Sequence, residues 1–561
     1  MGHVHRIGRA FGGATVLSVS SLMLLAGCST TGEQPETAGL FEGFGNYERE
    51  ITTRSEKSQA LFNQGMQFLY GFNHDEAIRS FESAAAEDPY AAMPWWGVAY
   101  ANGININDPA MNEARSKAAR SAADKALSRI GESSPKEADL IRAVSARYEW
   151  PAPEDRGHLD QAYADAMQKV YETYPDDPDV GALFAESLMN LQPWDYWTTE
   201  GEPRGRILEV VAVLEHILKA NPSHPGANHF YIHAVEASKT PERAVPAADR
   251  LRTLVPGSGH LVHMPSHIYI RVGRYADAAL SNIDAIAADR AYFANAPEPA
   301  MYAMYYGHNM HFLAYAGMMS GNYETAIGSA RELERDMPRA ALEAHAGFIE
   351  GIMPAKFHVM VRFGRWEEIL AEPKYEEDYR LVSKAVRLYA RAIAFSALDR
   401  PDEARSEIML FEEAASAIPE EWYVFNNQVN TVLPIAHAMV EGETLYREGR
   451  KAEAFAKLRE AIAYEDKLVY DEPPAWMLPV RHALGALLVA SGEFVEAEAV
   501  YREDLRRHIK NGWALTGLQQ ALFGQGKSVE ALALNDQIAA AFATADVKPS
   551  SSCYCEPGTK R

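Results

Sequence analysis

The chain has 561 residues, of which 47% are hydrophobic, and its formal net charge is −23 at pH 7. This composition is typical of a folded protein, and the length allows several domains or one long repeat array. A nucleic-acid partner needs a basic surface, so we expect no nucleic acid among the ligands of so acidic a chain.

The first 28 residues have the pattern of an export signal. Two arginines, Arg6 and Arg9, precede an apolar stretch that is too short for a transmembrane helix. Its end, Leu25-Ala26-Gly27-Cys28, resembles the bacterial lipoprotein cleavage box. The resemblance implies removal of residues 1–27, lipidation of Cys28 and anchoring to the outer membrane, on its periplasmic or cell-surface face. An ordinary secretory peptide with a chance cysteine is the alternative. No later stretch is long and apolar enough to span a bilayer, so we expect membrane attachment by the lipid alone.

Residues 28–56 are rich in Thr, Gly, Glu and Ser, and we predict that they form a flexible tether between the lipid and the folded part.

From residue 57 a helical repeat begins. The 34-residue tetratricopeptide pattern places small residues where two antiparallel helices touch and large residues between them. The first copy shows this pattern at Leu61, Gly65, Phe68, Ala77, Phe81, Ala84 and Pro89. A small anchor residue early in the second helix recurs at Ala244, Ala278, Ala326, Ala404, Ala454, Ala497 and Ala531. Turns containing Gly273, Gly321, Gly364, Gly449, Gly492 and Gly526 precede most of these anchors. The sequence therefore predicts an all-α tetratricopeptide solenoid over residues 57–543.

Three segments depart from the repeat. Residues 103–175 favour helices at 112–129 and 136–148 that fit the template poorly, and residues 293–306 form an insertion. Residues 544–561 are predicted to be a disordered tail. The tail holds Cys553 and Cys555, for which a strained disulfide and a thiolate metal pair are alternatives to having no role.

Histidines concentrate in the middle of the chain. Seven of 18 lie between Pro225 and Phe312, at steps of three or four that place them on one face of a helix. They are His229 and His233, with Glu236 three residues on; His260, His263 and His267; and His308 and His311.

The repeat register brings these side chains together. The alanine anchors start repeats at Pro225, Gly259 and Gly307, and in tetratricopeptide repeats positions two, five, nine and twelve of the first helix line the concave groove. The resemblance to that repeat therefore implies one histidine-lined groove between about 178 and 360. Glu186 and His358 take position nine of the flanking repeats and are expected to support the ligands.

Imidazole is a common ligand of transition metals, so we predict a metal site formed by His229, His233, Glu236, His260, His263, His267, His308 and His311. Zinc or copper suits histidine ligands best, and iron is possible. Two alternatives remain, a metal-free groove for an acidic peptide or anion, and ordinary packing. A metal in a protein-binding module and a metalloenzyme, hydrolase or oxidase, are both compatible with the pattern. The groove would accordingly take a protein or peptide, or a small-molecule substrate.

Several runs resemble a family of exported bacterial tetratricopeptide proteins that is largely uncharacterised. They are Pro193-Trp-Asp195, the run from His224 to Glu236 containing Asn-His-Phe-Tyr-Ile-His-Ala-Val-Glu, His263-Met-Pro-Ser-His-Ile-Tyr269 and Asn511-Gly-Trp513. The resemblance covers about residues 57–545 and implies the fold and the location. It carries no reaction and no catalytic residues.

Overall fold

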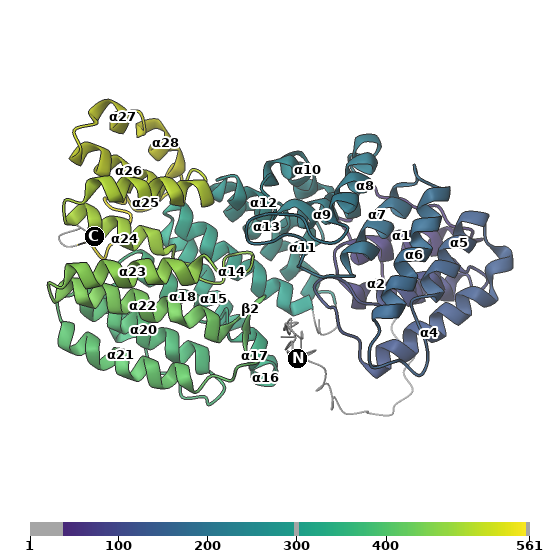
Figure 1. Ribbon diagram of the computed structural model, residues 1–561. Coiled ribbons are helices and arrows are strands. Elements are labelled where there is room, and N and C mark those ends of the chain that lie inside the picture. The colour runs from purple at the N-terminus through teal and green to yellow at the C-terminus, as the bar shows by residue number, and fades with distance from the viewer. Residues whose placement is uncertain (1–37, 297–301, 557–561) are drawn as a thin grey trace, which may run out of the picture.

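The computed structural model describes residues 38–296 and 302–556, and this part of the chain is an all-α tetratricopeptide-type solenoid. Figure 1 shows helices stacked from α1–α8 at one end, through α9–α14, to α19–α28 at the other end. Most consecutive helices pack against one another, while α15 packs on α18 and α26 packs on α28. Within the described residues no helix has the length and apolar character that crossing a membrane requires.

The first eight helices form the N-terminal end. They are α1 (Glu56–Tyr70), α2 (His74–Glu87), α3 (Met93–Ala101), α4 (Glu113–Ser128), α5 (Pro135–Ser145), α6 (Gly157–Thr173), α7 (Pro178–Met189) and α8 (Ile207–Ala220), with a 3₁₀ turn η1 (Ile130–Glu132). The two helices predicted between residues 103 and 175 are therefore present as α4 and α5.

The middle helices are α9 (Pro225–Val235), α10 (Val245–Leu254), α11 (Gly259–His263), α12 (Pro265–Arg271), α13 (Tyr275–Phe293), α14 (Tyr302–Ser320), α15 (Tyr323–Asp336), α16 (Arg339–Ala344), α17 (Ala346–Ile349) and α18 (Ala355–Arg362), with η2 (Pro241–Ala244). Part of the predicted 293–306 insertion is thus helical, since α14 begins at Tyr302, while residues 297–301 lie outside the described residues.

The C-terminal end contains α19 (Trp366–Ala371), α20 (Leu381–Ala397), α21 (Pro401–Ser416), α22 (Val429–Arg447), α23 (Lys451–Glu465), α24 (Val480–Ala490), α25 (Phe494–Arg507), α26 (Gly512–Gly524), α27 (Ser528–Leu532) and α28 (Asn535–Ala541). Between α21 and α22 a short antiparallel hairpin joins β1 (Tyr423–Val424) to β2 (Asn427–Gln428).

The small residues predicted to sit between paired helices do so. All seven anchor alanines, from Ala244 to Ala531, are completely buried. A methyl side chain at each site lets two helix backbones approach closely, and a larger side chain would separate them.

The turns between paired helices share one backbone geometry. The six turn glycines all have positive φ, between 64° and 81°. In each turn the following N–H donates to the carbonyl five residues earlier, as Arg274 does to Tyr269 at 2.8 Å. This Schellman arrangement closes the first helix and needs a residue that tolerates left-handed backbone, which is why glycine recurs there.

The helix predicted to carry His260, His263 and His267 is broken. It divides into α11 and α12 at Met264, and Pro265 is the first residue of α12. Proline has no N–H to continue the hydrogen-bond ladder and its ring crowds the preceding turn. Met264 keeps helical backbone angles, and all three histidines are buried.

The flexible tether predicted for residues 28–56 does not describe residues 38–55, which lie against the first helices. The Phe41 N–H donates to Gln64 Oε1 at 2.7 Å, and the Phe44 and Phe68 rings are 4.4 Å apart. Arg49 donates to Asp179 at 2.7 Å, and Tyr70 donates to the same carboxylate at 2.6 Å. The polar composition of this segment predicted flexibility, but Phe41, Phe44 and Arg49 hold it against the helices.

The predicted disordered tail is also ordered as far as residue 556. Asp546 accepts hydrogen bonds from the backbone N–H groups of Tyr323 and Glu324, and so caps the start of α15. Farther on, Ser552 is buried, and Cys553 and Cys555 form a disulfide. The cysteines therefore have a fixed place in the fold.

Replacing Asp179 by alanine should destabilise the protein by about 3 kcal/mol at pH 7, because the buried Arg49 and Tyr70 lose their shared acceptor and Arg49 keeps only the longer pair with Asp177, at 3.1 Å. Arg49, His224 and Tyr47 hold the pKa of Asp179 well below its usual range although burial acts the other way. The carboxylate's contribution is therefore complete above about pH 4 and is lost as pH falls through the lowered pKa. Urea unfolding, monitored by circular dichroism, measures the difference in free energy of unfolding between the wild type and the variant. Asp176→Ala, at a side chain 90% exposed, is the matched control, and equal stability of both variants would contradict the account.

Candidate metal centre

Six of the predicted histidines meet in the middle of the solenoid. Two come from α9, two from α11, and one each from α12 and α14: His229, His233, His260, His263, His267 and His308. Five of the six side chains are at most 3% exposed, and His308 is partly exposed. They divide into two triads, in each of which one ring nitrogen per histidine lies within 4.8 Å of the others.

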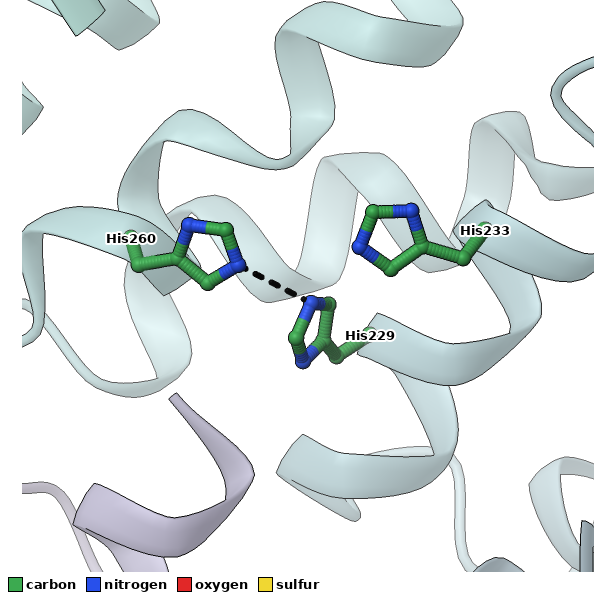
Figure 2. Close-up of side chains that lie close together, drawn as sticks. All are labelled: His229, His233 and His260. Carbon is green, nitrogen blue, oxygen red and sulfur yellow. Dashed lines mark hydrogen bonds between the residues drawn. The ribbon is translucent and has the colours of Figure 1, made fainter. Parts of the chain in front are cut away.

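The first triad is His229, His233 and His260. Figure 2 shows His229 and His233 on one helix, one turn apart, with the His260 ring facing them from another helix. The Nε2 atoms of His229 and His260 are 3.2 Å apart. Helix α9 is well defined at its start, where Pro225 is the first residue and the His224 ring accepts a hydrogen bond from the Ala227 N–H at 2.9 Å.

The second triad is His263, His267 and His308. The Nε2 atoms of His263 and His267 are 2.8 Å apart. The His308 ring centre lies 4.7 Å from that of His263 and 5.9 Å from that of His267. Residues of α11, α12 and α14 thus converge, although Pro265 interrupts the helix between the first two.

A buried carboxylate joins the two triads. Glu236 accepts a hydrogen bond from His233 Nδ1 at 2.8 Å and another from His267 Nδ1 at 2.5 Å. Burial acts to raise the pKa of Glu236, but His267 and His233 outweigh it and hold the pKa at about 2. Both carboxylate oxygens are thereby engaged with imidazoles. Glu236 therefore contacts one histidine of each triad, and together with His233 and His267 it forms a third group whose ligand atoms lie within 4.8 Å of one another, so its predicted role as a ligand stays a prediction.

Hydrogen bonds assign the protonated nitrogen of two further histidines. His229 Nδ1 is 2.6 Å from the carbonyl oxygen of Tyr70, which can only accept. His263 Nδ1 is 2.7 Å from Asn282 Oδ1, and the Asn282 amide is oriented by its donation to Ala278 O. Both Nδ1 atoms therefore carry hydrogen, and the Nε2 lone pairs of His229 and His263 point into the cluster.

The Nε2 atoms of His263 and His267 repel each other when both rings are neutral. His263 and His267 both donate through Nδ1, so two Nε2 lone pairs face each other at 2.8 Å. A proton or a cation between them removes the repulsion. Burial, with the neighbouring His267, lowers the pKa of His263 far below its usual value, which disfavours an extra proton on the His263 ring. His233 Nε2 is also buried without a hydrogen-bond partner. Neutral imidazoles whose second nitrogen is fixed by an acceptor are the usual state of metal-binding histidines, so the residues fit a transition metal.

Three aromatic residues with left-handed backbone surround the cluster. The ring of Phe72 (φ 54°) lies 4.6 Å from that of His229, that of Trp194 (φ 64°) 5.2 Å from His233, and that of Phe425 (φ 51°) 5.4 Å from His308. Only two other non-glycine residues in the described part of the chain have positive φ. Each such residue costs about 1–2 kcal/mol, so the surrounding structure holds these rings in place against strain.

Sequence reasoning missed these aromatics, although one left a signal. Phe72 occupies the turn position where six later repeats have glycine, and Asn73 makes the same turn hydrogen bond, to Phe68 O at 2.9 Å. Phe425 is at the tip of the β1–β2 hairpin, more than 100 positions after His308. No sequence pattern near Phe425 predicts that the two side chains are in contact.

Other predicted residues lie elsewhere. His311 is next to Phe425 and His358 next to Trp476, with ring centres 5.6 and 4.8 Å apart, and neither belongs to a triad. Burial lowers the pKa of His311 to about 3 and that of His358 to about 4. Glu186 accepts from Asn190 and Tyr100 and is bonded to no histidine. Cys28, the predicted lipidation site, lies outside the described residues.

Comparison with known proteins finds only distant likenesses among solved structures. No family model and no curated protein matches the chain. Among solved structures, human IFIT1 in a dimer with m7Gppp-AAAA is 12% identical with a TM-score of 0.30, covering 87% of this chain and 90% of that one. Yeast Tom70 is 12% identical with a TM-score of 0.29, covering 86% and 91%. At these values the likeness carries no argument about the fold, the ligands or the function of this chain.

Replacing Phe72 by glycine should leave the protein about 1 kcal/mol more stable than replacing it by alanine, because both changes remove the ring but only glycine relieves the left-handed backbone. The free energies of unfolding of the two variants are compared in urea. Glu413 is an exposed position inside α21 and serves as the control. There the alanine variant should be about 1 kcal/mol more stable than the glycine variant. Alanine more stable than glycine at both positions would show that Phe72 carries no strain.

Proposed function

We propose that the chain is a tetratricopeptide binding module whose middle repeats hold transition-metal ions through two histidine triads, His229/His233/His260 and His263/His267/His308. The opposed Nε2 lone pairs of His263 and His267 carry the proposal, because a cation is the group that best resolves them. One ion per triad, two in all, uses each histidine once.

The chemistry of the ligands limits which metal ions can bind. A set of imidazoles without thiolates suits zinc or copper best and accommodates iron. Glu236 would act through the imidazoles: by accepting their Nδ1–H groups it fixes both rings and makes their Nε2 atoms better donors. Tyr70 and Asn282 do the same for His229 and His263.

The location and partners proposed here rest on the sequence. The lipoprotein box at residues 25–28 supports an exported protein anchored to the outer membrane through Cys28. The resemblance of the run from His224 to Glu236 to exported bacterial tetratricopeptide proteins agrees with this location. A solenoid surface supports recognition of a protein or peptide, with a small-molecule substrate as the alternative, and the net charge of −23 opposes nucleic acid. The burial of the triads favours metal ions that stabilise the binding module.

The double variant His263→Ala, His267→Ala should lose one of two metal equivalents, because each triad holds one ion. The measurement is elemental analysis by mass spectrometry of the untagged chain carrying Cys28→Ser, reconstituted with zinc, copper or iron. His311→Ala, outside both triads, should keep two equivalents. Circular dichroism confirms that the variants stay folded. Equal metal content in the triad variant and in the wild type would refute the second site.

Replacing Glu236 by alanine should weaken zinc binding by about 10–100-fold, since two imidazoles lose the acceptor that orients them. Competition with a chromogenic chelator measures the affinity. Glu242→Ala, at an exposed residue of η2, is the control and should leave it unchanged. Unaltered affinity in Glu236→Ala would mean that the carboxylate has no part in the site.

A metal-dependent hydrolase is the second candidate, and one buried carboxyl favours it. Both oxygens of Glu472 are buried without a hydrogen-bond partner. Burial, with the nearby charge of Glu236, raises the pKa of Glu472 well above its usual value, which favours the protonated form that can donate a proton.

In that case the zinc-loaded chain should hydrolyse a chromogenic ester or phosphoester, and Glu472→Gln should lower the rate about 100-fold while two zinc ions remain bound. An absence of hydrolysis in the loaded wild type would leave the binding module as the only function supported by the site.

A further inference from the structure

The C-terminal segment brings two cysteines to a fixed place on the solenoid, far along the chain from the histidines. Ser552 Oγ donates to His482 O at 2.8 Å and is 2.6 Å from the Tyr501 hydroxyl. Arg362 donates to the Ser552 carbonyl at 3.1 Å. Ser552 is completely buried, and Cys555 is 2% exposed. The cysteines that flank Tyr554 are therefore held against the last repeats, and they form a disulfide.

Helix α22 presents two charged side chains to these cysteines. Arg447 donates to the carbonyl oxygen of Cys555 at 2.7 Å. Glu443 is one helical turn earlier on the same face. A carboxylate oxygen of Glu443 and the sulfurs of Cys553 and Cys555 all lie within 4.8 Å of one another.

The Glu443 carboxyl is largely buried. The residue is 5% exposed, and its side chain makes no hydrogen bond to the described residues. Burial raises the pKa of Glu443 to about 8, although Arg447 acts to lower it. A buried carboxyl without a partner costs free energy, and such groups call for an explanation. Next to two sulfurs, the ready explanation is a ligand that binds all three.

We propose that Cys553, Cys555 and Glu443 form a redox-gated site for a divalent metal ion of the zinc class. In the disulfide form the sulfurs are joined to each other and offer no thiolate. A dithiol reductant supplies two electrons and two protons: the Cys553–Cys555 bond breaks, two thiols form, and the reductant becomes a disulfide. The ion then binds two thiolates and the Glu443 carboxylate, and three protons go to solvent.

The charges around the site suit this ion. Two thiolates and a carboxylate carry three negative charges, a divalent ion compensates two of them, and Arg447 lies beside the third. Thiolate with carboxylate is a borderline-soft donor set, which favours zinc over the hard ions magnesium and calcium. The site uses α22 and the C-terminal segment, so it is independent of the histidine triads.

The test titrates the full chain carrying Cys28→Ser with Co²⁺, before and after reduction by a dithiol that is then removed without air. Cobalt bound to thiolate absorbs in the near ultraviolet, a signal that histidine sites do not give. We expect this band to saturate at one equivalent in the reduced chain and to be absent in the oxidised chain. Zn²⁺ should then displace the cobalt and abolish the band.

Glu443→Gln should weaken cobalt binding at this site at least 10-fold, whereas Glu441→Gln, two residues away and paired with Arg405, should leave it unchanged. The double variant Cys553→Ser, Cys555→Ser should lose the band while the His263→Ala, His267→Ala chain keeps it. Thermal unfolding shows whether each variant is folded. Absence of the band in the reduced wild type, or equal affinity in Glu443→Gln and the wild type, would overturn the proposal.

Discussion

Close approach of the two helices in each repeat is the constraint on which the remaining structure depends. Completely buried alanines such as Ala244, Ala278 and Ala326 allow that approach, and left-handed glycines such as Gly273 close the turns between the helices. Together they fix how far each helix is rotated about its axis. That rotation turns the histidine faces of α9, α11, α12 and α14 toward one another, so the histidine cluster is a consequence of repeat packing.

Burying six imidazoles in one place is costly unless each nitrogen has a partner. The fold meets this requirement on the Nδ1 side of four rings, through Glu236, Tyr70 and Asn282. It leaves the Nε2 side turned inward, with His233 Nε2 unpartnered and two lone pairs opposed. Strained aromatics, among them Phe72 and Trp194, pack against the same histidines. The proposed metal ions would give these Nε2 atoms a partner.

Much of the fold could be predicted from the sequence because its signals are local. Small residues at helix contacts and glycines in turns recur at a fixed period, and both were found where the register placed them. The grouping of six histidines followed from the same register. Steps of three and four predicted that Glu236 lies near His233. They could not reveal its bond to His267, which depends on how α12 leaves the break at Pro265.

Contacts between distant segments account for what the sequence did not show. Polar composition made residues 38–55 and 544–556 look unstructured, whereas Phe44, Arg49 and Asp546 dock them on helices far away in the chain. The place of Phe425 beside His308 likewise depends on how the hairpin is carried back across the solenoid. His311 follows the helical step of three from His308, but its ring lies outside the triads, beside Phe425.

Anomalous diffraction from crystals of the zinc-loaded chain, recorded on both sides of the zinc absorption edge, tests the central claim most directly. The account predicts two anomalous peaks, one among His229, His233 and His260 and the other among His263, His267 and His308. Each peak should be bonded to Nε2 atoms, with Glu236 hydrogen-bonded to His233 and His267. Crystals without a peak among these histidines, or with zinc bound only elsewhere on the chain, would contradict it.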